Sequence, residues 1–217
     1  MGLSRKETAF LCAVLIYSFV PSFGGLARLA ELAGAVALAP ANPRALAMPL
    51  PILIHVLSSA VFCLAGALQF MPGFRQRHRA WHRQTGYAVA ISGCLSAASG
   101  LWMTVAFTFP ADLQGPLLLS ARLVLGTAMI WLITSAVASA RAGRFQAHAA
   151  SMIRAYAIGQ GASTQAFLGL SFLLLTGVEA TGLVRDILMI AAWAANLAIA
   201  EFLIRRPLAL IRGGAPA

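Results

Sequence analysis

Two histidines stand where a pair of imidazoles could bind an iron ion inside a membrane. His82 begins the third long apolar stretch of the chain, and His148 begins the fifth. Two neutral imidazoles that face each other are the axial ligands of a b-type haem iron, which carries single electrons. Ionisable groups are expensive to bury at membrane depth, so those present are candidates for function. The pattern therefore predicts a haem b site with His82 and His148 as ligands.

Small residues follow both histidines along one face of each expected helix. Gly86, Gly93 and Gly100 follow His82 at intervals that return to the same side of a helix with about 100° per residue. The run after His148 is similar and consists of Met152, Ala155, Gly159, Ala162, Ala166 and Gly169. Such a stripe admits either a flat macrocycle, with Gly86 nearest the ligand, or another helix in close contact. Both interpretations stay open.

A second polar site is expected near the opposite membrane surface. His55 lies near the start of the second apolar stretch, and Arg122 lies just inside the fourth. If they face each other, Arg122 can bind a quinone carbonyl or a carboxylate; the alternative is that it snorkels to lipid headgroups. Arg154 follows His148 on the fifth stretch. It is expected either to neutralise a haem propionate or to bind a lipid phosphate.

Three further polar positions have other interpretations. Glu201 is the only acid well inside an apolar stretch, and we expect it to pair with Arg205 one turn away. His78 lies in an arginine-rich segment and is expected to be a solvated loop residue. The segment Gly159-Gln160-Gly161 could unwind locally and expose backbone carbonyls, which would favour binding or transport of a small molecule.

Six membrane-spanning helices must position these residues. Of the 217 residues, 60% are hydrophobic and 10% are charged, whereas about a quarter are charged in soluble domains. A helix needs about 20 residues to cross the hydrocarbon core, so six spans and their short connectors use nearly the whole length. We expect the spans at residues 9–30, 50–71, 85–109, 117–140, 150–175 and 186–204. The chain is therefore predicted to be an all-α, polytopic membrane protein with one domain over residues 1–217, which excludes a soluble globule, a disordered chain and a β-barrel.

The cations predict the orientation of these spans. With the amino terminus in the cytoplasm, four of the 16 Lys and Arg residues face outward, namely Arg28, Arg44, Arg122 and Arg185. The others face inward, namely Arg5, Lys6, Arg75, Arg77, Arg79, Arg83, Arg141, Arg144, Arg154, Arg205, Arg206 and Arg212. Positive charge in short loops stays inside, so both termini are predicted to be cytoplasmic. We expect a multi-pass protein of the bacterial inner membrane whose arginines contact lipid headgroups, with no nucleic-acid partner despite the net charge of +10.

The first span has an alternative interpretation. Two cations precede an apolar run from Ala9 to Val20, which is also the layout of a secretory signal. No convincing small-residue cleavage site follows this run directly, so we predict a retained helix. Cys12, Cys63 and Cys94 lie singly in apolar spans without a C-x-x-C spacing. They indicate neither a disulfide framework nor a thiolate metal site.

Three motifs lie in or beside the second, third and fifth spans. They are Gln69-Phe-Met-Pro72-Gly-Phe-Arg75, Trp81-His82-Arg83-Gln-Thr-Gly86 and His148-Ala-Ala-Ser-Met152-Ile-Arg154-Ala-Tyr156. Over roughly residues 50–160 they resemble a bacterial family of predicted membrane proteins known only as a domain of unknown function. The family has Arg where this chain has Tyr87, and Arg-Arg-Trp where it has Ala149, Ala150 and Ser151. The resemblance implies a membrane protein and brings no activity with it.

The layout is more distantly similar to the six-helix, ascorbate-dependent transmembrane cytochromes b. In these, the second to fifth helices each supply one haem-ligating histidine. His55, His82 and His148 match the ligands of the second, third and fifth helices by helix and by membrane side. Arg122 stands in the region of the missing fourth-helix ligand. The resemblance implies one complete inner haem site and an incomplete outer one.

These patterns favour electron transfer and leave two other classes open. The first hypothesis is a b-type haem electron-transfer protein or a quinone-linked oxidoreductase, with a quinone or another redox partner. The second is a protein that binds or transports a small molecule, a lipid or a proton. The third is a non-catalytic assembly subunit whose small-residue faces hold partner helices. Whether the chain is an enzyme stays open, and a homo-oligomer is compatible with each hypothesis.

Overall fold

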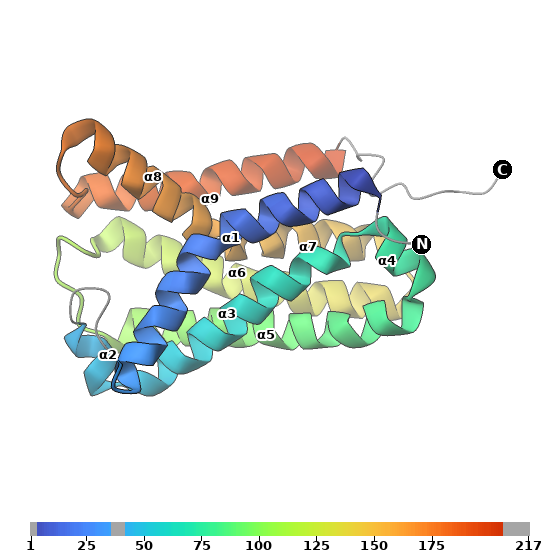
Figure 1. Ribbon diagram of the computed structural model, residues 1–217, viewed down its shortest axis with the longest axis horizontal. Coiled ribbons are helices and arrows are strands. Elements are labelled where there is room, and N and C mark those ends of the chain that lie inside the picture. Colours follow the sequence, from blue (N-terminus) through green and yellow to red (C-terminus); the bar gives the residue numbers. More distant parts are fainter. Residues whose placement is uncertain (1–3, 36–41, 206–217) are drawn as a thin grey trace.

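Six spans run side by side in the computed structural model, which describes residues 4–35 and 42–205 (Figure 1). They are α1 (Arg5–Leu32), α3 (Pro49–Gln69), α5 (Arg79–Ala106), α6 (Pro116–Arg141), α7 (Phe145–Gly159) together with α8 (Gly161–Thr176), and α9 (Gly182–Arg205). Two short helices, α2 (Pro43–Ala47) and α4 (Pro72–Arg77), lie in the connections. The described residues contain no strand, and each span is long and apolar enough to cross a membrane. The prediction of an all-α, six-span protein is confirmed.

Helices α5 and α7 begin five or six residues earlier than their apolar stretches predict. The predicted starts were 85 and 150, whereas α5 begins at Arg79 and α7 begins at Phe145. Polar residues occupy these first turns, with Arg79 and His82 in α5 and Gln146 and His148 in α7. The turns are therefore helical although they lie outside the apolar stretches. His82 and His148 therefore lie within the first turn of their helices and do not precede them. Where proline begins a helix, as in α3 and α6, the predicted start was within one residue, because proline suits the first helical position.

The spans form a closed ring. Around it, α1 packs on α3, α3 on α5, α5 on α6, α6 on α7, α7 on α9, α9 on α8, and α8 returns to α1. Helix α3 also contacts α7 across the ring, whereas α5 and α7 do not pack extensively on each other. The expectation that the third and fifth spans form a neighbouring pair is therefore wrong. The interior between them is filled by side chains from α3 and α6.

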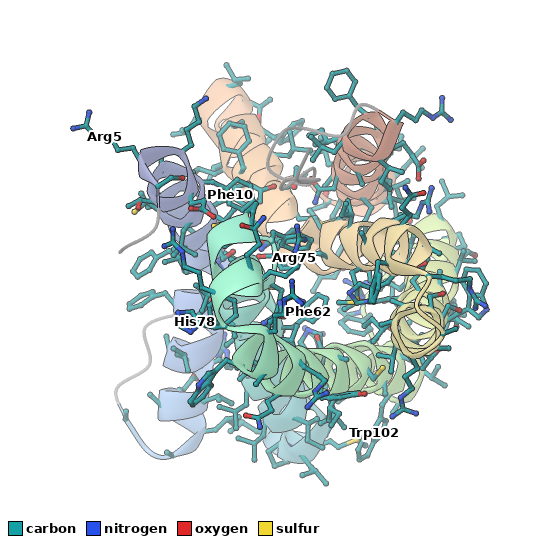
Figure 2. All side chains as sticks on the ribbon, turned by 90° about the vertical axis from the view of Figure 1, so that its right-hand side faces the viewer. Arg5, Phe10, Phe62, Arg75, His78 and Trp102 are labelled. Carbon is teal, nitrogen blue, oxygen red and sulfur yellow. The ribbon has the colours of Figure 1, made fainter. Side chains whose placement is uncertain are left out.

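Phe62 of α3 fills the centre of the ring (Figure 2). Its side chain is fully buried, and it lies between Gly93 of α5 and Gly159 of α7. A methyl group on either glycine would lie 2.6 Å from the Phe62 ring. Both positions must therefore be glycine for α3 to pack between α5 and α7 at this distance.

The glycine stripe of α5 packs against α3. A methyl group at Gly86 would meet Gln69, and one at Gly100 would meet His55, both of which belong to α3. Gln69 also donates a hydrogen bond of 2.7 Å to Thr85 Oγ1 on α5. Of the two interpretations of this stripe, the structure favours helix packing, because side chains of α3 contact it at Gly86 and at Gly100.

The outer surface of the bundle is apolar, as expected for helices in contact with lipid. Leu174, Leu175 and Val105 are 74 to 86% exposed. Helix α1 begins and α9 ends at the same end of the bundle, beside α4 (Figure 1). We name this the His82 end and the opposite one the Arg122 end. Which end faces the cytoplasm stays a prediction, and Arg206 and Arg212, counted above as cytoplasmic, lie outside the described residues.

Candidate functional site

His82 and His148 lie at the same end of the bundle on different helices. His148 Nδ1 donates a hydrogen bond of 3.0 Å to the carbonyl oxygen of Ala136 on α6, which leaves the lone pair of its Nε2 free to accept. His82 Nδ1 is buried and has no hydrogen-bond partner among the described residues. The rings are near enough for positive charges on both to repel each other. The side chains available here to ligate a metal ion are thus two imidazoles. The described ranges hold no cluster of three or more His, Cys, Asp or Glu residues that could hold a metal ion.

Arg154 is engaged with an acid of another helix. Its Nε donates to Glu201 Oε1 at 2.5 Å, and its Nη2 donates to Glu201 Oε2 at 2.9 Å. This two-point pair joins α7 to α9. The expected pairing of Glu201 with Arg205 is corrected, because the face of α9 that carries Glu201 points toward α7. Arg154 is therefore already neutralised, whereas we had expected it to meet a propionate or a lipid phosphate.

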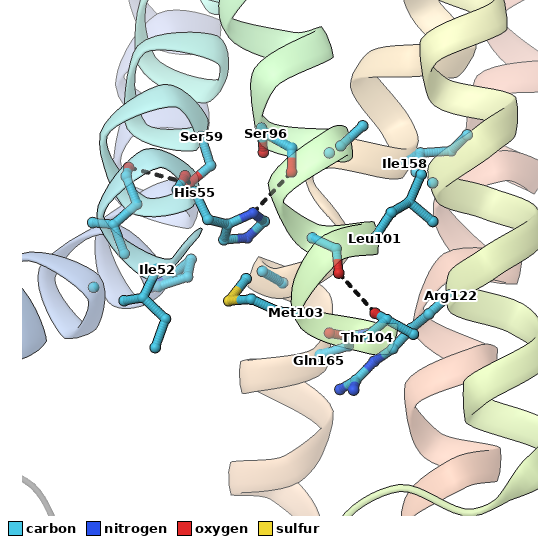
Figure 3. A pocket seen from close by; sticks show the side chains of 18 of the residues that line it. Ile52, His55, Ser59, Ser96, Leu101, Met103, Thr104, Arg122, Ile158 and Gln165 are labelled. Atoms are coloured by element: carbon cyan, nitrogen blue, oxygen red, sulfur yellow. Dashed lines mark hydrogen bonds between the residues drawn. The ribbon is translucent and has the colours of Figure 1, made fainter. Parts of the chain in front are cut away.

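A cavity of about 470 Å³ occupies the Arg122 end of the bundle and reaches its middle (Figure 3). Both His55 and Arg122 line it, so the structure brings the predicted outer pair into one space. Most of the wall is apolar and comes from α3, α5 and α6, with Ile158 and Trp193 at the inner end. A volume of this size suits a small molecule.

His55 presents one ring nitrogen for hydrogen bonding. Its Nδ1 donates to the carbonyl oxygen of Ser96 on α5 at 2.9 Å, and the hydroxyl oxygen of Ser99 lies 3.3 Å from the same nitrogen. Because a carbonyl can only accept, the proton resides on Nδ1 and Nε2 carries the lone pair. The imidazole projects from α3 toward α5 in Figure 3. It can therefore accept a hydrogen bond from a molecule in the cavity.

The inner end of the cavity meets a break in the fifth span. Helix α7 ends at Gly159 and α8 begins at Gly161, as the sequence Gly159-Gln160-Gly161 suggested. Carbonyl groups next to the break accept from side chains: Asn196 Nδ2 donates to Ala157 at 3.1 Å, and Trp193 Nε1 donates to Ile158 at 3.1 Å. The indole also fits tightly on Gly161, where a methyl group would lie 2.1 Å from Nε1. Such breaks are tolerated at membrane depth only where protein or a cavity surrounds them.

Helix α1 reaches the same break. Gln160 Nε2 donates to Ser18 Oγ and to Tyr156 Oη, each at 2.9 Å. Ser18 is buried, and Tyr156 Oη donates to the carbonyl oxygen of Cys63 at 2.6 Å. These bonds hold α1, α3 and α7 together around the break. The first span is therefore an integral part of the described bundle.

Two residues of the cavity mouth were missed by the sequence analysis. The Arg44 guanidinium lies 5.0 Å from the centroid of the Phe109 ring, and the Arg122 guanidinium lies 5.3 Å from it. All three side chains line the cavity. A usable signal was present, because Arg44 is one of the few cations that the predicted orientation places outside. Phe109 gave none, because an aromatic residue in a connector is common.

The family comparison identifies the kind of protein that these elements build. Residues 52–204 match the model of a family described as "Predicted membrane protein (DUF2306)". The chain belongs to this family. Neither the curated proteins nor the solved structures gave a match. The predicted resemblance to a membrane-protein family of unknown function is thus confirmed over a longer stretch than expected, whereas the likeness to cytochromes b has no support. The protein is a multi-pass membrane protein.

Proposed function

We propose that this protein binds a small amphipathic molecule in the cavity at the Arg122 end. The observation that carries the proposal is the course of the cavity, which runs from a mouth lined by Arg44 and Arg122 to the break between α7 and α8. Broken helices with a cavity beside them recur in membrane proteins that bind small solutes at mid-depth. An apolar wall with a few polar groups is also the usual make-up of a small-molecule site.

The polar groups are arranged along the length of this cavity. The cations stand at the mouth, His55 Nε2 lies further in, and Ser163 of α8, which donates a hydrogen bond to Gln160, lines the part beside the break. Gln165 of α8 also lines the cavity. Gln165 Nε2 donates to the carbonyl oxygen of Met189 at 3.2 Å, which leaves its own side-chain oxygen available to accept. A bound molecule would therefore meet positive charge at one end and hydrogen-bonding groups spaced along an apolar wall.

A cavity-filling substitution tests the proposal. Gly100 lines the cavity, and a methyl group there would make an ordinary contact of 3.4 Å with His55. We expect Gly100→Leu to fold and to fill the space. Native mass spectrometry of the wild type released from its own membranes should show one bound small molecule, and Gly100→Leu should lose it.

The matched control is Gly169→Leu. Gly169 belongs to α8, and a methyl group there would meet nothing within 4 Å. This variant makes the same glycine-to-leucine replacement at a position that does not line the cavity. It should therefore keep the bound molecule. A wild type that carries nothing, or a Gly100→Leu variant that carries as much as the control, would contradict the proposal.

Electron transfer by a b-type haem is a second candidate function, and one observation favours it. The buried Nδ1 of His82 has no hydrogen-bond partner among the described residues, and an orphaned buried nitrogen is costly unless a ligand satisfies it. His148 is held in the tautomer that ligates through Nε2, which is a common arrangement for metal-binding histidines. His82 and His148 would hold the iron, and the haem would supply one-electron transfer. A quinone is one amphipathic molecule that could bind in the cavity and exchange electrons with such a haem.

Absorption spectra decide this second proposal. Protein from haem-replete cells should show a Soret band and an α band that change on reduction with dithionite. The bands should vanish in His82→Ala and in His148→Ala and persist in His78→Ala, because His78 is exposed between α4 and α5. Colourless wild-type protein would refute the haem proposal and leave the cavity proposal untouched.

A further inference from the structure

The mouth of the cavity collects cations. Of the four Lys and Arg residues predicted to lie outside, Arg44 and Arg122 share one aromatic ring, that of Phe109. Arg185 lies close enough to Arg122 for their charges to interact, and its Nε donates to the carbonyl oxygen of Leu113 at 3.2 Å. Three of the four therefore gather at one place, against the tendency of positive charge to avoid that side of a membrane.

Acids in the described part of the chain do not neutralise this cluster by salt bridges. The pairs found there join Arg28 to Glu31 and Arg154 to Glu201. Arg122 donates instead to the neutral side chain of Gln114. The Nε atom of Arg44 is buried without a hydrogen-bond partner in residues 4–35 and 42–205.

The carboxylate whose charge acts on Arg122 is occupied elsewhere. Asp186 is almost fully buried, with one oxygen accepting from the backbone N–H of Gly115 at 3.0 Å and the other from that of Leu118 at 3.1 Å. It thus caps the first turn of α6, where a negative charge is stabilised. The negative charge of Asp186 attracts Arg122, but both of its carboxylate oxygens accept hydrogen bonds from the backbone. The guanidinium groups keep unused donors that an anion can satisfy.

Behind the cations the cavity wall is mostly apolar. Its wall there is formed by Ile52, Leu101, Leu125, Met129, Ile158 and Trp193. A free inorganic anion would gain no free energy from contact with this apolar surface, whereas a hydrocarbon chain that covers the surface would. We therefore propose that the occupant is a single-chain amphiphile with an anionic head group. The Arg44 and Arg122 guanidinium groups hold the head beside Phe109, and the chain extends toward the break at Gln160.

This inference rests on the proposed function and names the chemical class of the molecule. Carboxylate and phosphate heads share the required chemistry, because both accept the forked donors of arginine. A cationic head would meet repulsion from the three arginines. A neutral head of the same chain length would keep the apolar contacts and lose the charge-assisted hydrogen bonds.

Equilibrium binding of radiolabelled dodecanoate to the full chain in phosphatidylcholine nanodiscs tests the inference. Empty nanodiscs correct for partition into lipid. Arg44→Gln and Arg122→Gln should each weaken binding about tenfold, which is the usual loss for one charge-assisted hydrogen bond. Arg122→Lys keeps the charge and should recover part of the affinity. Arg28→Gln is the matched control, because Arg28 pairs with Glu31 and does not line the cavity, and it should bind like the wild type.

Competition with other twelve-carbon compounds defines the head group. Dodecyl phosphate should displace dodecanoate, and dodecyltrimethylammonium should not. Dodecanol should compete at least tenfold more weakly than dodecanoate, and equally in the wild type and in Arg44→Gln. If dodecanol binds the wild type as tightly as dodecanoate, the inference about charge is overturned while the proposed function survives. If no amphiphile binds and Gly100→Leu behaves like the wild type, both fail together.

Discussion

At the residue scale, backbone carbonyls decide what two of the histidines can do. His55 donates to Ser96, and His148 donates to Ala136, both through Nδ1. Each ring therefore offers Nε2 as an acceptor or ligand, which is a property of the fold and not of the histidine itself. His82 has no such partner for its Nδ1 in the described part of the chain. His82 thus differs from His55 and His148 in the ring nitrogens that it can offer to a ligand.

The pair of Arg154 and Glu201 gives a prediction at this scale. Each side chain is about one-third exposed, so the pair is partly screened, although its two-point geometry is favourable. Arg154→Gln and Glu201→Gln should each lower the melting temperature by about 2 °C, and the double variant should lower it no further than the worse single one. Arg205→Gln is the control, since Arg205 is the partner that the sequence suggested. A loss for Arg205→Gln equal to that for Arg154→Gln would restore the sequence-based pairing.

At the element scale, the fifth span combines a predictable feature with an unpredictable one. Two glycines around Gln160 weaken the helix, so the break between α7 and α8 was visible in the sequence. The donors that satisfy the freed carbonyls were not visible, because they come from α9, which lies far along the chain. Asn196 and Trp193 could be recognised only as polar groups within an apolar span.

Replacing the indole N–H tests this account of the break. Trp193→Phe keeps an aromatic ring but leaves the carbonyl oxygen of Ile158 without its donor. The expected cost is about 1 kcal/mol, or a melting temperature lower by roughly 3 °C in detergent. Trp131 is 65% exposed on the outer surface, so Trp131→Phe should change the melting temperature by less. Equal melting temperatures for the two variants would mean that the break needs no donor from α9.

At the scale of the whole molecule, the ring of spans separates two polar regions. Helices α5 and α7, whose first turns carry the histidine pair, begin at the end where α1 begins (Figure 1). The cavity mouth at Arg44 and Arg122 belongs to the other end. Phe62 and the two glycines on which it packs close the middle of the ring. Two functions could therefore occupy the two ends, and each has its own test above.

Orientation in the membrane is the prediction that belongs to this scale. In a background with Cys12, Cys63 and Cys94 replaced by serine, single cysteines at Ala142 and Glu179 report opposite ends, and both positions are exposed. A membrane-impermeant maleimide added to intact cells should label Glu179→Cys and leave Ala142→Cys unlabelled. Opening the membrane should make both react. The reverse pattern would place both termini outside and contradict the orientation derived from the cations.

The sequence alone determined the number of spans, their approximate ends and the break at Gln160. These are local properties, because each helix satisfies its backbone within one segment and needs a fixed apolar length to cross lipid. Only the tertiary structure decided which spans are neighbours, that the glycine stripe of α5 receives α3, and that Arg44 joins Arg122 at Phe109. In lipid every apolar face is equally well solvated, so the choice of partner depends on the fit between surfaces far apart in the chain.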